Sequence, residues 1–396
     1  MKILWHANAA HTGTGYGTQT ALTAPALQAL GHDIAISAFY GIQGAITDWN
    51  TIKTYPAGYD AYGNDVILNH ARDHFGGNLA DGLIITLVDA WVLATDQLKQ
   101  APTACWAPVD HDPAPEPVLE FFRQSGATPI AMSRFGEREL ARHDLAPLYV
   151  PHAVDTQLFQ EVDRAEARAA IGLPEQAFVV GMVAANKGFP PRKGFPEAIG
   201  AFARFAAKHD DALMYLHTEA HGQVNGVNLP SIVAAHGLPP DRVRFIDPYR
   251  YITGLPTSFM PNVYSALDVL LNPSYGEGFG VPLIEAQSCG TPVIATDWTA
   301  MRELAGPGWL VDGQLAWSEQ GSFRKVPSVD GIVAALEQAH TTAHRRRKWA
   351  RDFALDYDIT TVVRDHWTPV LAELERRFRP VTIGKPKSAG KKAVRA

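Results

Sequence analysis

Cysteine is nearly absent from this sequence, which has only Cys105 and Cys289 among 396 residues. Two thiols are too few for a disulfide framework, so the composition favours a reducing compartment. The chain also lacks a run of about 18 apolar residues, the length that a membrane-spanning helix needs. The longest candidate, 82–94, is interrupted by Asp89, and Met1–Trp5 is too short for the apolar region of a signal peptide. These absences predict a cytoplasmic protein without a transmembrane segment.

Several catalytic motifs and an excess of basic charge are missing as well. There is no Gly-x-Ser-x-Gly elbow, Cys–His pair or Walker-type Gly-Lys-Ser/Thr loop, which argues against the enzyme classes that use them. The net charge is −6, and because residues 385–396 carry five basic side chains and no acid, the remainder of the chain carries −11. An acidic body is unsuited to binding duplex DNA, although the basic tail could direct the protein to nucleic acid or to an anionic membrane.

The residues that are present describe a large folded protein. With 46% hydrophobic and 19% charged residues, the chain is long enough for two domains. Short runs rich in Ile, Val and Leu alternate with stretches long enough for a helix, which is typical of parallel sheets with crossover helices. We expect strands at Lys2–Trp5, Asp33–Phe39, Asp65–Leu68, Leu83–Val88, Thr103–Ala107, Pro129–Met132, Leu148–Val150, Phe178–Ala184, Leu213–His217, Val243–Ile246, Val269–Leu271, Pro292–Thr296 and Trp309–Val311, and helices at Thr18–Leu30, Arg164–Ile171, Ile332–His340, His344–Phe353 and Thr361–Phe378. The sequence therefore predicts two doubly wound α/β domains, with ligand bound where the carboxyl ends of the strands meet.

The junction between the domains is predicted near Val150–Asp155, which leaves the last strand of the first half and precedes a polar segment. We expect an N-terminal Rossmann-like domain at 1–154 and a C-terminal Rossmann-like domain at 155–343. Amphipathic helices at 344–380 are expected to cross back to the N-terminal domain, and 381–396 to form a basic disordered tail.

The most informative stretch is 272–296. It leaves a strand, passes through the glycine-rich loop 276–280 and enters a helix. Glycines let a backbone approach a ligand closely, and the free N–H groups of a helix N-terminus favour a phosphate. Glu277 lies in the loop and Glu285 about one turn into the helix, where both carboxylates can accept hydrogen bonds from sugar hydroxyls. The combination suits a molecule with a phosphate in the middle and a sugar at each end.

The sequence from Glu277 to Glu285 resembles the E-x7-E signature of retaining nucleotide-sugar glycosyltransferases with the GT-B fold, specifically glycosyltransferase family 4. Val150–Asp155 and Ala266–Asp268 resemble other segments of that family. The resemblance implies an α/β fold of two Rossmann-like domains facing a cleft. It places the acceptor on the N-terminal domain, 1–154, and the nucleotide sugar on the C-terminal domain, 155–343. It also implies that Glu277 contacts hydroxyls of the transferred sugar and Glu285 the ribose of the nucleotide. Further donor-binding residues implied in the same loop are Gly278, Phe279 and Gly280.

A basic loop, Asn186–Phe195, follows the first strand of the second domain. A loop in that position faces the cleft, where Arg192 and Lys193 would bind a diphosphate and neutralise it as the glycosidic bond breaks. The family often has its Arg next to the strand glycine, where this chain has Met182, so either Lys187 or Arg192 is expected to substitute. We predict donor contacts from all three cations and a catalytic role for Lys193; a solvated basic loop is the alternative.

A glycine-rich segment, His11–Gly17, lies between the first predicted strand and helix. As a dinucleotide fingerprint it is weak. The resemblance implies that Gly13, Gly15 and Gly17 reach across the cleft toward the phosphates and the acceptor. The alternative is a tight turn that only packs the strand against the helix.

Polar side chains also follow the predicted strands of the first domain. The resemblance implies that either Asp110 or His111 lies near the donor sugar, holding a hydroxyl or assisting the acceptor. With Asp112 they could be taken for metal ligands, but adjacent side chains point in different directions and no second cluster completes a set, so we expect no metal. Asp89 and Trp91 are either an acceptor-side carboxylate and stacking platform or packing residues.

These features predict a metal-independent retaining glycosyltransferase with a UDP- or GDP-linked sugar as donor and no permanently bound cofactor. The resemblance implies same-face transfer, in which the departing diphosphate, held by Arg192 and Lys193, helps to accept the acceptor's proton. The acceptor is left open among a protein, a lipid-linked molecule, a small molecule and a modified nucleic acid, as is the oligomeric state. Alternative functions are a catalytically silent sugar-nucleotide or glycan-binding module, a transferase acting on modified DNA, and a phosphorylase, which would need a pyridoxal-phosphate lysine and a longer chain.

Overall fold

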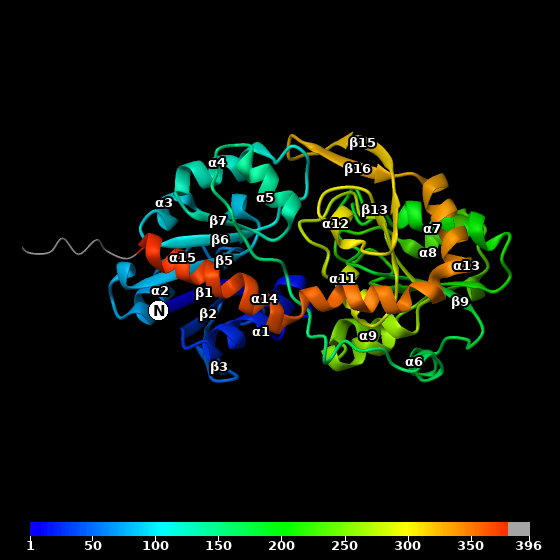
Figure 1. The fold of residues 1–396 in the computed structure, drawn as a ribbon, viewed down its shortest axis with the longest axis horizontal. Helices are drawn as coiled ribbons and strands as arrows, with labels where there is room; N and C mark the ends of the chain where they lie inside the picture. The colour runs from blue at the N-terminus through cyan, green and yellow to red at the C-terminus, as the bar shows by residue number, and fades with distance from the viewer. Residues whose placement is uncertain (379–396) are drawn as a thin grey trace, which may run out of the picture.

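Two parallel sheets, each in its own domain, organise the computed structural model, which describes residues 1–378 (Figure 1). The first domain contains an eight-stranded sheet in the order β3-β4-β2-β1-β5-β6-β7-β8, and the second a six-stranded sheet in the order β11-β10-β9-β12-β13-β14. All pairs in these sheets are parallel except β3 with β4. The predicted α/β class with two doubly wound domains is confirmed, whereas the tail predicted at 381–396 lies outside the described residues.

The strands have the following bounds. Those of the first domain are β1 (Lys2–Asn8), β2 (Asp33–Tyr40), β3 (Thr47–Trp49), β4 (Ile52–Tyr55), β5 (Gly82–Leu87), β6 (Thr103–Ala107), β7 (Thr128–Ala131) and β8 (Leu148–Tyr149). Those of the second are β9 (Phe178–Val183), β10 (Ala212–His217), β11 (Val243–Phe245), β12 (Val269–Asn272), β13 (Val293–Thr296) and β14 (Trp309–Val311), together with the antiparallel hairpin of β15 (Gly313–Trp317) and β16 (Phe323–Pro327).

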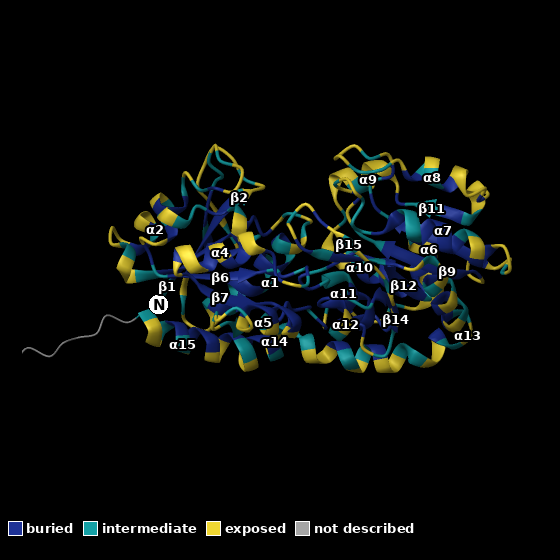
Figure 2. Cartoon of the chain, turned by 90° about the horizontal axis from the view of Figure 1, so that it is seen from above, coloured by how far each residue is buried: buried dark blue, intermediate teal, exposed yellow. Residues whose placement is uncertain are grey.

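The helices cover both sheets. They are α1 (Gly15–Ala29), α2 (Ile67–Phe75), α3 (Thr95–Leu98), α4 (Glu116–Ser125), α5 (Arg134–Ala141), α6 (Arg164–Ile171), α7 (Phe195–Ala206), α8 (Leu229–Ala235), α9 (Pro248–Thr253), α10 (Met260–Ser265), α11 (Val281–Ser288), α12 (Met301–Leu304), α13 (Val329–Ala354), α14 (Ile359–Val362) and α15 (Thr368–Phe378). In Figure 2 the central strands are buried, while the outer faces of helices such as α13 and α15 are exposed.

The strand orders fix where loops gather. β1 lies between β2 and β5, and β9 lies between β10 and β12, so the chain winds in opposite directions from the middle of each sheet. Ligands of doubly wound sheets bind outside the carboxyl ends of the strands at such points. The loops that follow β1, β5 and β6 in the first domain, and β9 and β12 in the second, are therefore the ones that position a site.

The chain crosses between the domains twice. After the first sheet it passes Val154, whose backbone pairs with that of Asp358 on the return path, with Val154 N–H donating to Tyr357 at 2.9 Å. On that path Trp367 packs edge-on against Trp5 and Trp106 of the first sheet, with ring centroids 5.6 and 5.0 Å apart. The C-terminal segment thus returns to the first domain, as Figure 1 shows for α15. The domain limits themselves stay predictions, and the one expected at 343 falls within α13.

Some predicted elements are wrong. Asp65–Leu68 is not a strand but a turn leading into α2, because the Asp60 carboxylate accepts hydrogen bonds from nearby backbone N–H groups and α2 then buries Ile67, Leu68 and others on one face. The two helices expected between 332 and 353 are the single helix α13, and α1 begins at Gly15 rather than Thr18. The short strand β3 at the sheet edge, its neighbour β4 and the hairpin β15–β16 were not predicted.

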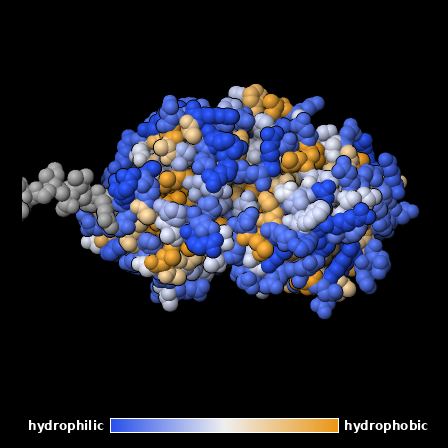
Figure 3. Space-filling view, in the orientation of Figure 1, coloured by the Kyte–Doolittle hydropathy of each residue, from blue (hydrophilic) through white to orange (hydrophobic). Residues whose placement is uncertain are grey.

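On the face drawn in Figure 3, apolar residues form separate spots among hydrophilic ones. Among the helices of residues 1–378, we find none that combines the length and apolar character needed to cross a membrane.

Candidate functional site

The site lies where loops of the two domains touch. An added Cβ on Gly276 would stand 2.1 Å from the backbone oxygen of Asp110, and one on Gly278 would stand 2.3 Å from Cβ of Pro108. Both distances are shorter than any van der Waals contact, so these positions require glycine for the two backbones to meet. In this structure the space beside the two glycines is therefore filled by the first domain rather than open to a ligand.

Glu277 is the centre of a partly buried ion-pair cluster. Its side chain is 12% exposed and is hydrogen-bonded to the Lys193 ammonium, while the Arg192 guanidinium lies 3.8 Å from its other oxygen. Burial opposes ionisation of Glu277, but the two cations outweigh it and hold the pKa of its carboxyl below the usual value. Burial lowers the pKa of Lys193, and the charge of Glu277 opposes that effect. The three groups stay charged because the attraction between opposite charges offsets the cost of removing each charge from water.

Local backbone contacts fix these side chains. Gly194 caps α7 in the left-handed conformation with φ 72°, and an added Cβ there would stand 2.2 Å from the backbone oxygen of Pro273. Tyr275 N–H donates to the backbone oxygen of Arg192 at 2.8 Å. The Thr299 hydroxyl clamps Glu277 by accepting from its N–H at 3.1 Å and donating to its carbonyl at 3.0 Å. The loops after β9 and β12 are thus held together as one unit.

Two carboxylates of the first domain lie close enough to Arg192 to influence its charge. Burial opposes ionisation of Asp110, but the 2.6 Å hydrogen bond from His111 and the positive charges of Arg192 and Arg324 hold its pKa well below the usual range. Burial and the charge of Asp110 raise the pKa of Asp89, which accepts a long 3.5 Å hydrogen bond from the Tyr16 hydroxyl. The charges of Asp110 and Asp89, with that of Glu277, raise the pKa of Arg192 despite its burial.

The structure distinguishes Asp110 from His111, between which the sequence did not choose. His111 is completely buried, with one ring nitrogen on Asp110 and the other 2.9 Å from the Ser318 hydroxyl. The side chain of Asp110 remains 24% exposed. The geometry therefore favours Asp110 as the group that can meet a ligand and His111 as the residue that positions it.

The unpredicted hairpin β15–β16 braces the loop that carries Asp110. Asp112 pairs with Phe323 in an antiparallel bridge, and the Ser322 hydroxyl donates to the backbone oxygen of Pro113. Nearby, the Glu303 carboxylate accepts from the first two N–H groups of α5 at 2.7 and 3.0 Å. Figure 1 shows the hairpin beside both domains. Second-domain elements thus hold the first-domain half of the site in place.

Glu285 lies on α11, which starts after Gly280 in a left-handed conformation with φ 111°. The Tyr264 hydroxyl donates to its carboxylate at 2.6 Å. Burial raises the pKa of Glu285 to about 7, although the Tyr264 hydrogen bond opposes the shift. Phe279, expected beside the donor, is buried in the core near the rings of His152 and Tyr357, with centroids 5.1 and 5.8 Å away.

The glycines near the amino terminus divide into two kinds. The Thr14 side chain caps α1 by accepting from Gly17 N–H at 3.0 Å, so Gly15 and Gly17 belong to the first helical turn and not to a loop. An added Cβ on Gly17 would stand 2.2 Å from the Thr12 hydroxyl oxygen, whereas Gly13 and Gly15 are exposed with nothing within 4 Å. Packing alone explains Gly17, and only the other two border open space.

Lys187 is not brought into this cluster. Its side chain is exposed and makes no hydrogen bond or ion pair with the described part of the chain. Lys187 and Arg192 are the two candidates to substitute for the arginine that the family often has next to the strand glycine. Of the two, Arg192 is the one that lies beside Glu277. No local pattern pointed to Tyr264, Thr299 or Arg324, whose roles at the site depend on contacts between distant segments.

Comparisons with known proteins identify the fold of this chain. Residues 177–337 match the family model described as Glycosyl transferases group 1. Over 95% of this chain, the structure resembles all of sucrose-phosphate synthase from Thermosynechococcus elongatus, with a TM-score of 0.74 and 19% identity. It also resembles all of Anabaena HepE, solved in complex with UDP-glucose, over 94% of this chain, with a TM-score of 0.68 and 16% identity. The chain therefore has the GT-B fold of glycosyltransferases.

Curated relatives match over part of their length. A D-inositol 3-phosphate glycosyltransferase of Kribbella flavida is 30% identical over 195 residues, which are 46% of this chain and 45% of the relative. The protein of the same name from Salinispora tropica is 35% identical over 225 residues, 54% of this chain and 42% of the relative. The chain thus spans less than half the length of these relatives.

Proposed function

We propose that this protein is a retaining glycosyltransferase that moves a sugar from a nucleotide diphosphate sugar to an acceptor without a metal. The observation that carries the proposal is the partly buried cluster of Glu277, Arg192 and Lys193 at the domain interface, next to the helix that bears Glu285. Two fixed cations suit a diphosphate, and two carboxylates on either side suit sugar hydroxyls. A UDP-linked donor is the first candidate because HepE binds UDP-glucose; a GDP-linked donor is the second.

In the proposed reaction, Arg192 and Lys193 bind the diphosphate, Glu277 and Asp110 accept hydrogen bonds from hydroxyls of the transferred sugar, and Glu285 binds the ribose. The bond between the anomeric carbon and the phosphate oxygen breaks, and the acceptor oxygen bonds to that carbon on the same face. The acceptor's proton passes to the departing phosphate oxygen, whose negative charge the two cations offset. Positioning and charge stabilisation drive such a step without a covalent intermediate.

The acceptor belongs to the first domain in this proposal, where Asp89 and Tyr16 face the cluster. The relatives' name makes D-inositol 3-phosphate the first acceptor to test. A protein, a lipid-linked molecule, another small molecule and a modified nucleic acid follow. A cytoplasmic location is part of the same proposal.

The test is release of nucleoside diphosphate from UDP- and GDP-linked sugars with and without these acceptors. We expect Glu285→Gln and Lys193→Met to lower kcat/KM by about 100-fold, as removal of single charge-stabilising groups does in other enzymes. Lys348→Met is the matched control, because Lys348 is exposed on α13 and, within residues 1–378, pairs only with Asp352. Undiminished turnover in both site variants would contradict the assignment of Glu285 and Lys193 to the site. Tight donor binding with no turnover for any acceptor or for water would instead indicate a binding module.

A further inference from the structure

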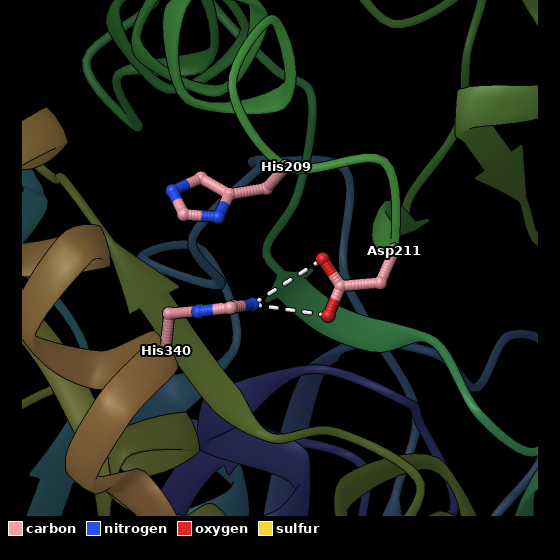
Figure 4. Close-up of side chains that lie close together, drawn as sticks. All are labelled: His209, Asp211 and His340. Atoms are coloured by element: carbon pink, nitrogen blue, oxygen red, sulfur yellow. Dashed lines mark hydrogen bonds and ion pairs between the residues drawn. The ribbon is translucent and has the colours of Figure 1, made fainter.

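A cluster of histidines and carboxylates lies on the second domain, apart from the site described above. His209 follows α7, Asp211 immediately precedes β10, and His340 lies on α13. One potential ligand atom from each lies within 4.8 Å of the others. Figure 4 shows His340 pointing at the Asp211 carboxylate, whose two oxygens are 3.0 and 3.3 Å from Nε2, with the His209 ring beside them.

A fourth side chain supports the arrangement from outside. Nε2 of His209 is 2.8 Å from the carboxylate of Glu337, which is one helical turn before His340 on α13. Histidines that bind metals commonly donate their second ring N–H to a carboxylate, which fixes the tautomer. With the proton on Nε2, Nδ1 of His209 carries a lone pair, and among the described residues it has no hydrogen-bond partner.

Packing holds both rings in place. His209 stacks on Phe205 with centroids 4.3 Å apart, and His340 packs edge-on against Phe178 at 4.8 Å. The two imidazoles are themselves 4.4 Å apart. Asp211 is 48% exposed at its side chain, so an ion can enter from solvent. Ligand atoms around a tetrahedral zinc ion are about 3.3 Å apart, so closing the site needs shifts of about an ångström.

We propose that His209, Asp211 and His340 form a transition-metal site of the zinc type, completed by a water molecule and supported by Glu337. Two imidazoles and one carboxylate are typical ligands of Zn²⁺, whereas Mg²⁺ and Ca²⁺ prefer oxygen alone. The metal would tie α13 to the turn between α7 and β10. Because Asp211 stands at the amino end of β10, and the ion-pair cluster follows the carboxyl ends of β9 and β12, this metal is structural and separate from sugar transfer. Sequence spacing gave no sign of it, since Asp211 and His340 are 129 positions apart.

The test uses the untagged full chain, stripped with chelator and titrated with ZnCl₂ by calorimetry. We expect one Zn²⁺ per chain and, at a hundredfold excess over the dissociation constant, a rise in Tm of about 5 °C. MgCl₂ should give neither effect. Parent protein that binds no stoichiometric zinc would overturn the proposal.

Variants locate the bound ion. His209→Ala and His340→Ala should each weaken zinc binding at least tenfold, and Glu337→Gln about 10-fold to 100-fold. Because both rings pack against phenylalanines, Asp211→Asn is the decisive variant: it keeps the shape of an exposed side chain and should also weaken binding at least tenfold. The control is His344→Ala, a histidine exposed on the same helix. Parental affinity in Asp211→Asn and His209→Ala would place the zinc elsewhere and reject this site.

Discussion

Under the proposed function, donor binding should strengthen as the pH rises through about 7, because the Glu285 carboxyl would lose its proton before it accepts hydrogen bonds from two ribose hydroxyls. Burial raises its pKa to about 7, and the 2.6 Å hydrogen bond from Tyr264 keeps the pKa from rising further. With that pKa, about a tenth of the free protein carries the ionised group at pH 6 and about nine-tenths at pH 8. The kcat/KM for the donor, which reports the free enzyme, should therefore rise about tenfold over this interval.

The assay is initial-rate release of nucleoside diphosphate at subsaturating donor between pH 6 and 8. Glu285→Gln has no proton to lose, so its rate should be low and independent of pH over the same interval. Tyr264→Phe removes the hydrogen bond that favours the carboxylate, so its profile should keep the parental slope with the midpoint at higher pH. A flat parental profile, or the same rise in Glu285→Gln, would show that another group titrates.

The same carboxyl links stability to pH. Because its pKa is raised in the folded chain, the folded chain binds this proton more tightly than the unfolded chain does, and parental stability falls as the pH rises from about 4.5 to about 7. That difference in pKa corresponds to about 3 kcal/mol of free energy of unfolding. Glu285→Gln removes this loss, so urea denaturation should find the variant gaining stability relative to the parent as the pH is raised.

Other changes test the contacts around the cluster. Lys193→Ala should lower the free energy of unfolding by about 1–3 kcal/mol, because it removes the nearer of the two cations that pair with the Glu277 carboxylate and leaves only Arg192 at 3.8 Å. Adding Glu277→Gln should restore most of the loss in urea denaturation; a double variant no more stable than the single one would contradict this. Gly276→Ala should lower Tm, since its Cβ would stand 2.1 Å from a first-domain carbonyl oxygen, whereas Gly13→Ala, with nothing within 4 Å, should not; equal Tm values would refute the packing argument. Glu303→Ala should lower the free energy of unfolding by about 1–2 kcal/mol, because the first two N–H groups of α5 lose their acceptor while the Ser133 cap remains, and an unchanged denaturation midpoint would show that solvent replaces it.

Much of the fold was predictable because buried parallel strands appear in the sequence as short apolar runs. That signal located β1, β9 and β12, whose following loops carry the site. It failed for β4, which is short and near a sheet edge, and for α2, whose first residues, Ile67 and Leu68, look like a strand until the capping turn before them is known. The start of α1 was misplaced because glycines obscured the cap at Thr14.

The second-domain half of the candidate site was predictable from local spacing, since Glu277, Glu285, Arg192 and Lys193 lie in two short segments. The first-domain half was only partly so. The position of Asp110 beside Arg192 depends on the hairpin β15–β16 and on close contact at the glycine loop, which no local pattern reports. The burial of Phe279 likewise depends on a distant return segment. Contacts between segments far apart in the chain are what single-sequence reasoning does not supply.

The charges of the cluster imply a rearrangement on donor binding. Arg192 and Lys193 supply two positive charges, which Glu277 and Asp110 already balance, while Asp89 has a raised pKa. A diphosphate adds further negative charge, so under the proposed function it is accommodated by replacing Glu277 as the partner of Lys193. The released carboxylate is then free to accept hydrogen bonds from the sugar attached to that diphosphate. In the free protein, the ion pair keeps Glu277 and Lys193 charged although both are partly buried. When the donor binds, Lys193 pairs with its diphosphate and Glu277 accepts hydrogen bonds from its sugar.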